Sequence, residues 1–68
     1  MSQDDLSVVL NHAGIQLQQF QVRLMIQGGG AIIPGPVFPP IPLHDGSRLE
    51  SRRVETIQGP MTALYLRQ

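Results

Sequence analysis

The apolar positions of residues 3–27 recur at alternating spacings of four and three residues. The pattern is carried by Leu6, Leu10, Ala13, Leu17, Phe20 and Leu24. Such a heptad-like repeat is typical of an amphipathic helix whose apolar stripe packs against a partner. Ser2 is a suitable N-cap for this helix, and the glycines at 28–30 are a strong stop signal. The pattern therefore predicts one N-terminal amphipathic helix over 3–27, with the apolar stripe as an oligomer seam.

The second half of the same segment also has the alternation of a β-strand. Apolar and polar side chains alternate around Phe20, Val22, Leu24 and Ile26. Gly14 is a poor helix former in the middle of the proposed helix. The alternative is a helix over 3–13 followed by a strand over 15–27, which needs a bulge near residue 18 to keep its apolar face in phase. The sequence leaves both interpretations open.

Residues 28–43 contain no polar or charged side chain, and nine of the sixteen are glycine or proline. Proline is excluded from helix interiors and central strands, so we expect an extended, polyproline-like arm. Flexible linkers are normally polar. This arm instead carries apolar side chains at Ile32, Ile33, Val37, Phe38, Ile41 and Leu43. We predict that these are partner-contact residues and that the arm lies along an apolar surface of its own assembly.

The segment after the arm is compatible with either a helix or strands. Ser47 and Glu50 have the spacing of a capping box, which would suit a helix over 47–58. The β-branched residues and the poor helical stripe of this segment favour strands instead. We therefore predict a pair of short strands over 48–57 and 61–67.

A chain of 68 residues forms at most one domain. We expect a single small α+β domain with a helical oligomerisation segment at 3–27, an arm at 28–43 and a β-rich part at 44–68; a mostly β fold is the alternative. A domain of this size buries too little surface to be stable without disulfides, a bound metal ion or association with another chain. The absence of cysteine excludes disulfides and thiolate metal sites. We therefore expect an oligomer-dependent fold, a homodimer or homotrimer, or binding to a larger protein assembly.

The charges argue against nucleic acid as a partner. Five acidic residues balance five basic ones, all of which are arginine. Arg48, Arg52 and Arg53 are close in sequence but lie among Glu50 and Glu55, so they do not form the uncompensated basic patch that phosphates require. Arginine is enriched at protein interfaces and lysine is depleted. These three arginines are therefore candidate polar contacts with a protein partner.

Low overall charge also favours a protein whose surface is partly covered. Only 15% of the residues are charged, against about 25% in a typical domain. The acidic N-terminus does not resemble a secretory signal, and no stretch of about 18 residues is continuously apolar. We expect no membrane span, and a location inside the cell or in a virion.

His44, Asp45 and Ser47 include the residue types of a catalytic triad. A triad is assembled from distant segments so that base and nucleophile align. These three residues instead surround the turn dipeptide Asp45-Gly46. The sequence therefore predicts a turn with local side-chain capping.

Other candidate sites also favour structural roles. Asp4 and Asp5 suit the positive end of a helix dipole, and His12 lies off the apolar stripe, where a solvated histidine is expected. The glycine-rich stretch 28–35 lacks the Lys-Ser/Thr and the following helix of a phosphate-binding loop. Two PxxP patterns within 36–42 offer a recognition peptide as an alternative to a structural arm. No catalytic, cofactor-binding or metal site is predicted.

Together these features favour a non-enzymatic structural or assembly protein that acts through self-association and protein contacts. Short chains without cysteine and poor in lysine are common among accessory proteins of compact viral genomes, so a virion-associated subunit is one form of this hypothesis. The first alternative is a small binding or inhibitor protein that masks a larger partner. The second is an oligomeric ligand-binding protein with sites between its subunits.

Overall fold

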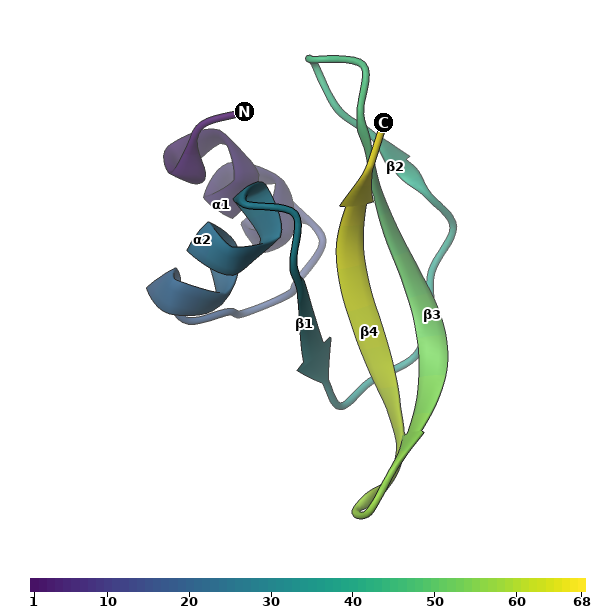
Figure 1. Cartoon of the computed structure of the whole chain (residues 1–68). Coiled ribbons are helices and arrows are strands. Elements are labelled where there is room, and N and C mark those ends of the chain that lie inside the picture. The colour runs from purple at the N-terminus through teal and green to yellow at the C-terminus, as the bar shows by residue number, and fades with distance from the viewer.

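Two short helices pack on one face of a four-stranded sheet in the computed structural model, which describes residues 1–68 (Figure 1). In chain order the elements are α1 (Gln3–His12), α2 (Gln19–Ile26), β1 (Gly30–Ile33), β2 (Ile41–Pro42), β3 (Arg48–Thr56) and β4 (Gly59–Arg67). All strand pairs are antiparallel, and the order across the sheet is β1-β4-β3-β2. The expected mixed α+β fold is therefore confirmed. Neither helix is long and apolar enough to cross a membrane.

The N-terminal segment forms two helices, so the predicted continuous helix over 3–27 is wrong. α1 ends near Gly14, whose φ of +76° is a left-handed conformation through which a right-handed helix cannot continue. α2 starts after Gln18, whose backbone N–H donates to Gln21 Oε1 at 2.9 Å. The alternative interpretation places the first helix correctly, but its strand over 15–27 is also wrong.

The strand-like alternation in α2 comes from two different faces of a helix. Val22 and Met25 are buried, and residues three apart lie on the same helical face. Phe20 and Leu24 are four apart and point outward, with 56% and 45% of their surfaces exposed. Because apolar residues lie on both faces of this helix, apolar and polar residues alternate along its sequence as they would in a strand.

The residues predicted as one oligomer seam are distributed over different surfaces, because the helix is interrupted between them. Leu6 and Leu10 are buried in the core of the chain itself. Ala13 is exposed and Leu17 is half-buried, both in the connection between the helices. The last two seam residues point outward from α2. No continuous helical stripe joins the predicted set.

A single small apolar core joins the helical layer to the sheet. Both helices and three of the strands contribute its buried side chains, which are Leu6, Leu10, Val22, Met25, Ala31, Leu49 and Leu64. Half-buried apolar residues from the rest of the chain surround this cluster. The fold therefore depends on a few side chains that are almost completely removed from water.

β3 and β4 form a long hairpin, which confirms the predicted strand pair and shows that no helix forms over 47–58. Its tight loop is Ile57-Gln58. The Thr56 hydroxyl donates to the carbonyl oxygen of Gly59 at 2.8 Å and accepts the N–H of Gln58 at 3.2 Å. Gly59 has a φ of +106°, which favours glycine. These contacts fix the register of the hairpin.

The Gly/Pro-rich segment lies against the sheet of its own chain. Its first part is β1, which pairs with β4, and its last part includes β2, which pairs with β3. Between them, residues 34–40 are held by side chains of the hairpin. The Thr62 hydroxyl donates to the carbonyl oxygen of Gly35, and the Ser51 hydroxyl accepts the N–H of Phe38 at 2.9 Å and donates to its carbonyl oxygen at 3.2 Å. The predicted arm thus supplies both edge strands of the sheet.

Most of the predicted partner-contact residues of the arm pack within the chain. Half-buried side chains that touch the core are Ile33, Phe38, Ile41 and Leu43. Ile32 and Val37 instead point outward, with 52% and 46% of their surfaces exposed. Of this set, these two side chains present the most surface to a partner.

Truncating the buried face of α1 should destabilise the protein far more than truncating its exposed face. Leu10→Ala should lower the free energy of unfolding by about 2–5 kcal/mol, because it leaves a cavity in the core. Val8 is 55% exposed on the same helix, so Val8→Ala should change the free energy by less than about 0.5 kcal/mol. Urea denaturation followed by circular dichroism measures both values. Equal effects would show that α1 does not pack as described.

Candidate functional site

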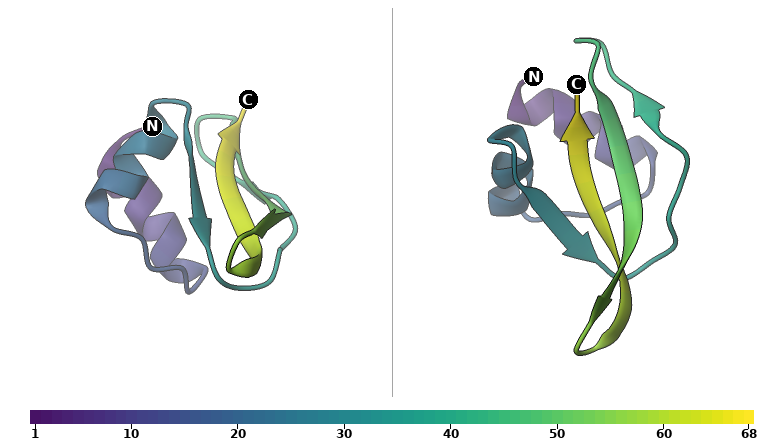
Figure 2. Two further views of the ribbon diagram at one scale, coloured as in Figure 1. Left: turned by 60° about the horizontal axis from the view of Figure 1, so that its bottom comes forward. Right: turned by 45° about the vertical axis from the view of Figure 1, so that its right-hand side comes forward.

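The sheet face that points away from the helices has no helix packed on it (Figure 2, right). Strand side chains alternate between faces, and Thr62 and Leu64 point into the core. Their neighbours along β4 therefore point outward, together with the residues that pair beside them on β1 and β3. We call this surface the open face; it consists of Ile32, Arg48, Glu50, Arg52, Val54, Met61, Ala63, Tyr65 and Arg67.

The middle of the open face is apolar. Ile32 lies beside Ala63 across the β1–β4 ladder, and Val54 lies beside Met61 across the β3–β4 ladder. Ile32 is half exposed, and the other three side chains are partly exposed. Neighbouring apolar side chains on adjacent strands form a continuous patch, and here this patch is in contact with water.

A shallow groove of about 620 Å³ runs along the β1 side of this patch. The glycines at 28–30 form one wall, and the rest is lined mainly by open-face residues, together with Ala31 and Leu64. A Cβ atom at Gly30 would lie 2.9 Å from the carbonyl oxygen of Leu64, which is too close for any larger residue without movement. The close approach of Gly30 to β4 at this wall therefore requires glycine.

One end of the open face is a polar cluster centred on Glu50. This carboxylate lies 3.4 Å from Arg48 Nε and 4.0 Å from Arg67 Nη1, and it accepts a hydrogen bond from the Tyr65 hydroxyl at 3.3 Å. The Glu50 side chain is only 15% exposed, whereas the two arginine side chains are 50% and 64% exposed. Exposed ion pairs contribute at most about 1 kcal/mol, so the cluster mainly orients these side chains.

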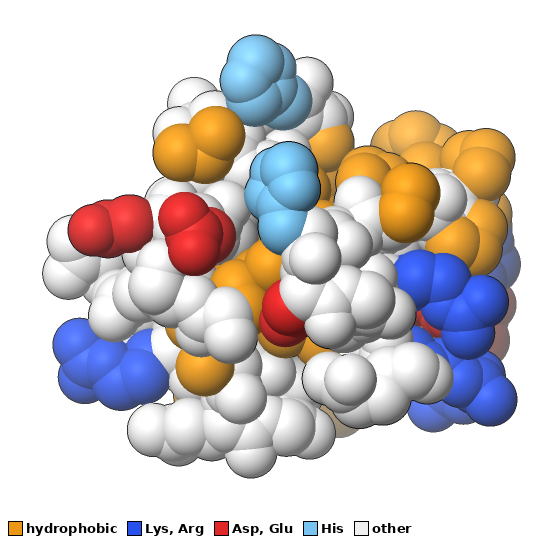
Figure 3. Space-filling view, turned by 90° about the horizontal axis from the view of Figure 1, so that it is seen from above, with side chains coloured by type: hydrophobic (Ala, Val, Ile, Leu, Met, Phe, Trp, Pro, Cys, Tyr) orange, Lys and Arg blue, Asp and Glu red, His pale blue; other side chains and the backbone are white.

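The open face carries more positive than negative charge. Its three arginines face a single carboxylate, and Arg52 takes part in none of the ion pairs. The main group of basic side chains in Figure 3 lies on the sheet side of the molecule, and a further basic side chain lies on the other side. Two of the arginines predicted as polar contacts, Arg48 and Arg52, belong to this surface. Arg53 does not, because alternation directs it to the other face of β3.

Sequence reasoning missed six members of this surface, which are Glu50, Val54, Met61, Ala63, Tyr65 and Arg67. The register places Tyr65 opposite Glu50 and Arg67 opposite Arg48. The alternation of Ala63, Tyr65 and Arg67 along the predicted last strand indicates a shared face. The sequence does not show which strand pairs with the last strand, or in which register, so it could not place the last two of these residues beside Glu50 and Arg48.

A second hollow, of about 550 Å³, lies between the helix connection and the Pro-rich loop. Its apolar lining includes Ile15, Ile33, Phe38 and Ile41, and none of its lining residues is titratable. This composition suits an apolar group and offers no acid, base or nucleophile. The hollow is thus a candidate for packing contacts.

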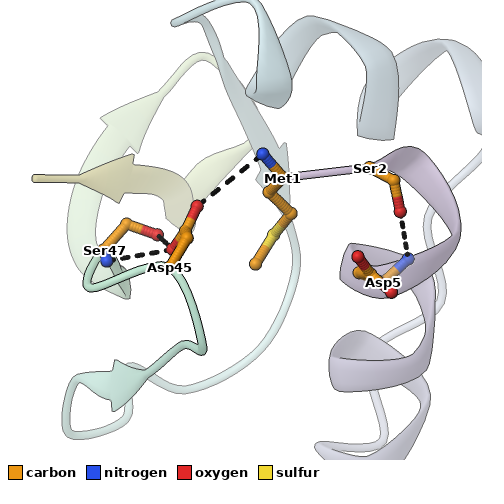
Figure 4. Close-up of polar contacts among 5 residues, drawn as sticks. All are labelled: Met1, Ser2, Asp5, Asp45 and Ser47. Carbon is orange, nitrogen blue, oxygen red and sulfur yellow. Dashed lines mark hydrogen bonds and ion pairs between the residues drawn. The ribbon is translucent and has the colours of Figure 1, made fainter.

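The residues 44–47 form a capped turn, as the sequence predicts (Figure 4). Asp45 Oδ1 accepts the Ser47 hydroxyl at 2.5 Å and the Ser47 backbone N–H at 3.0 Å. Ser47 is 2% exposed, and its hydroxyl donates to Asp45 rather than to His44. The arrangement caps a turn and does not have the hydrogen-bond order of a nucleophilic triad.

The same turn is tied to the N-terminus by the amino group of Met1, which lies 3.7 Å from Asp45 Oδ2. The hydrogen bonds from Ser47 hold the pKa of Asp45 below its ordinary value, and the positive charge of Met1 acts in the same direction. The carboxylate therefore helps to hold the turn before β3 close to the start of α1.

The remaining candidates lie on the surface of the helical layer. Asp4 and Asp5 are exposed in the first turn of α1, where Ser2 Oγ accepts the N–H of Asp5 at 3.1 Å. His12 is exposed in the last turn. The glycines at 28–30 connect a helix to a strand, which is the reverse of the order in a phosphate-binding loop. No group of three or more histidine or acidic side chains is placed to hold a metal ion.

Comparisons with protein-family models, curated proteins and solved structures gave no match to this chain. The function must therefore be inferred from the open face and its chemistry.

Replacing Ser47 should weaken the perturbation of Asp45. Ser47→Ala removes the donor with the largest effect, so the pKa of Asp45 should rise toward its ordinary value of about 3.9. A lowered pKa stabilises the fold above about pH 4, and this contribution is lost as the pH falls through the folded-state pKa. The wild type should therefore lose more stability on acidification than Ser47→Ala. Carboxyl ¹³C NMR titration measures the pKa, and Ser7→Ala is the control that should leave it unchanged. An unaltered pKa in Ser47→Ala would contradict the assignment.

Proposed function

We propose that this protein is a non-enzymatic assembly subunit that binds further copies of itself through the open face. The proposal is carried by one observation: an apolar patch, partly exposed and bordered by arginine and tyrosine, lies on a sheet face that no helix covers. Protein interfaces have this organisation, with an apolar centre and a polar rim. Tyrosine and arginine are also the residue types that contribute most at binding hot spots.

The energetics of the fold support the same proposal. Only nine of the 68 residues are buried, and seven of these are apolar. A domain with so small a core is marginally stable alone. Binding of a second copy to the folded state adds stability by mass action. Covering the open face would remove its apolar patch from water, which is worth about 25 cal/mol per Å² of apolar area.

The expected setting is a homo-oligomer within a larger protein assembly. The absence of cysteine and lysine, together with the short chain, favours an accessory subunit such as one found in a virion or inside a cell. The side chains proposed for contact are those of the open face, and Val37 is a further exposed apolar residue of the arm. No bound ligand or cofactor is part of the proposal.

Polar substitution in the apolar patch should weaken self-association. Ile32→Thr keeps a β-branched residue in β1 but removes apolar surface, so we expect roughly a fivefold to tenfold rise in the dissociation constant, about 1–1.4 kcal/mol. Sedimentation equilibrium over a concentration series measures this constant.

The matched control for this experiment is Leu24→Gln on the outer surface of α2. Leu24 is 45% exposed, close to the value for Ile32, and glutamine is a good helix former. The control should associate like the wild type. A monomeric wild type at millimolar concentration would overturn the proposed function. Loss of association in Leu24→Gln but not in Ile32→Thr would show that the interface lies on the helices and not on the open face.

A further inference from the structure

The charges of this protein sum to zero but are distributed unevenly over its surface. The open face carries three arginines and one carboxylate, whereas Asp4 and Asp5 lie on α1 and Arg23 lies on the neighbouring α2. Figure 3 shows acidic side chains on the opposite side of the molecule from the main group of basic side chains, with a further basic side chain near them. A chain with one locally acidic surface and one locally basic surface attracts copies of itself in the orientation that brings these two surfaces together. This separation indicates which surface the open face would meet.

The outer surface of α1 has the chemistry to complement the open face. Leu6 and Leu10 point into the core, so residues on the other side of the helix point outward. Asp4, Val8 and Asn11 are all exposed, and their spacings of four and three place them on one stripe. Val8 is 55% exposed. This stripe combines a carboxylate with an apolar side chain, as the open face combines arginine with an apolar patch.

Building on the proposed function, we propose that copies of this chain associate head to tail, with the outer surface of α1 from one copy bound to the open face of the next. Carboxylates of Asp4 and Asp5 pair with Arg52 and Arg67, and Val8 packs on the apolar patch. Arginine binds carboxylates with two parallel hydrogen bonds, which fixes orientation as well as adding affinity. Arg52 is available for this role because no carboxylate of its own chain pairs with it.

The charge distribution disfavours a pairing of two open faces. Such a pairing would bring the arginines of two copies together, while each Glu50 is already engaged by Arg48, Arg67 and Tyr65 of its own chain. Like charges at an interface raise its energy. The acidic surface of α1 instead brings negative charge to these arginines, so its pairing with the open face is attractive.

The two surfaces lie on different sides of the molecule, so each copy can bind two neighbours. An interface between unlike surfaces generates a ring if the rotation between copies closes, and a filament if it does not. The proposal therefore replaces a symmetric dimer by a ring, such as a trimer, or by an open chain of copies.

Charge reversal with mixing tests this arrangement. Arg52→Glu alters only the open face, and Asp4→Arg/Asp5→Arg alters only α1. Each variant alone should associate at least tenfold more weakly than the wild type. Arg52→Glu leaves the open face with two arginines and two carboxylates, so its excess positive charge is lost, whereas Asp4→Arg/Asp5→Arg gives α1 the same sign as the open face. In sedimentation velocity, an equimolar mixture should have a higher average mass than either variant alone, because the altered open face of one variant binds the altered α1 of the other. Added sodium chloride should weaken wild-type association.

Two controls separate charge effects from folding effects. Arg53→Glu makes the same substitution on the other face of β3 and should associate like the wild type. Asp4→Asn/Asp5→Asn removes the negative charge without placing arginines at a helix N-terminus, and it should also weaken association. Circular dichroism of each variant checks that it is folded.

Each of the remaining outcomes contradicts the proposal in a distinct way. If the α1 variants associate like the wild type while Arg52→Glu does not, the open face binds a different surface; the proposed function then stands and the head-to-tail arrangement is wrong. A mixture whose average mass does not exceed that of either variant alone also overturns the arrangement. A wild type that stays monomeric overturns both proposals.

Discussion

The ladder between β3 and β4 is the constraint on which the rest of this structure depends. β1 pairs with the outer edge of β4, and β2 pairs with the outer edge of β3. The hairpin also holds the Pro-rich loop through Ser51 and Thr62, and it places Leu49 and Leu64 beneath the helices. Because the same strands carry the open face on their other side, the hairpin that organises the core also determines the candidate interface.

The sequence was sufficient for the elements that depend on local chemistry. The β-branched residues of the C-terminal part predicted the hairpin strands, and Asp45-Gly46 predicted the turn before them. The long helix was wrong because seven-residue periodicity outweighed Gly14 in the interpretation, whereas its positive φ ends α1. The arm was expected to cover an assembly, but its apolar side chains largely pack on a sheet that the same chain forms later in its sequence. That contact depends on long-range pairing, which a single sequence does not display.

The candidate site was predictable only in part, for the same reason. Arg48 and Arg52 are four residues apart, so on a strand they lie on the same face, and the sequence alone indicates this. Tyr65 and Arg67 join them only through the register of the hairpin. The groove beside Ile32 likewise depends on the pairing that brings Gly30 close to Leu64 of β4. Sequence patterns thus identified the residue types, and strand pairing decided which of them meet.

The two outer strands of the sheet are short, and this has a consequence for how the protein avoids uncontrolled polymerisation. β1 has four residues, and β2 has two, one of which is Pro42. Proline has no N–H to donate, and short margins offer few backbone groups to an incoming strand. Amyloid-like growth by strand addition is therefore disfavoured at both sides of the sheet. Any contact between copies would then depend on side chains, which differ from one sequence to another, and not on backbone hydrogen bonds, which every sequence can offer.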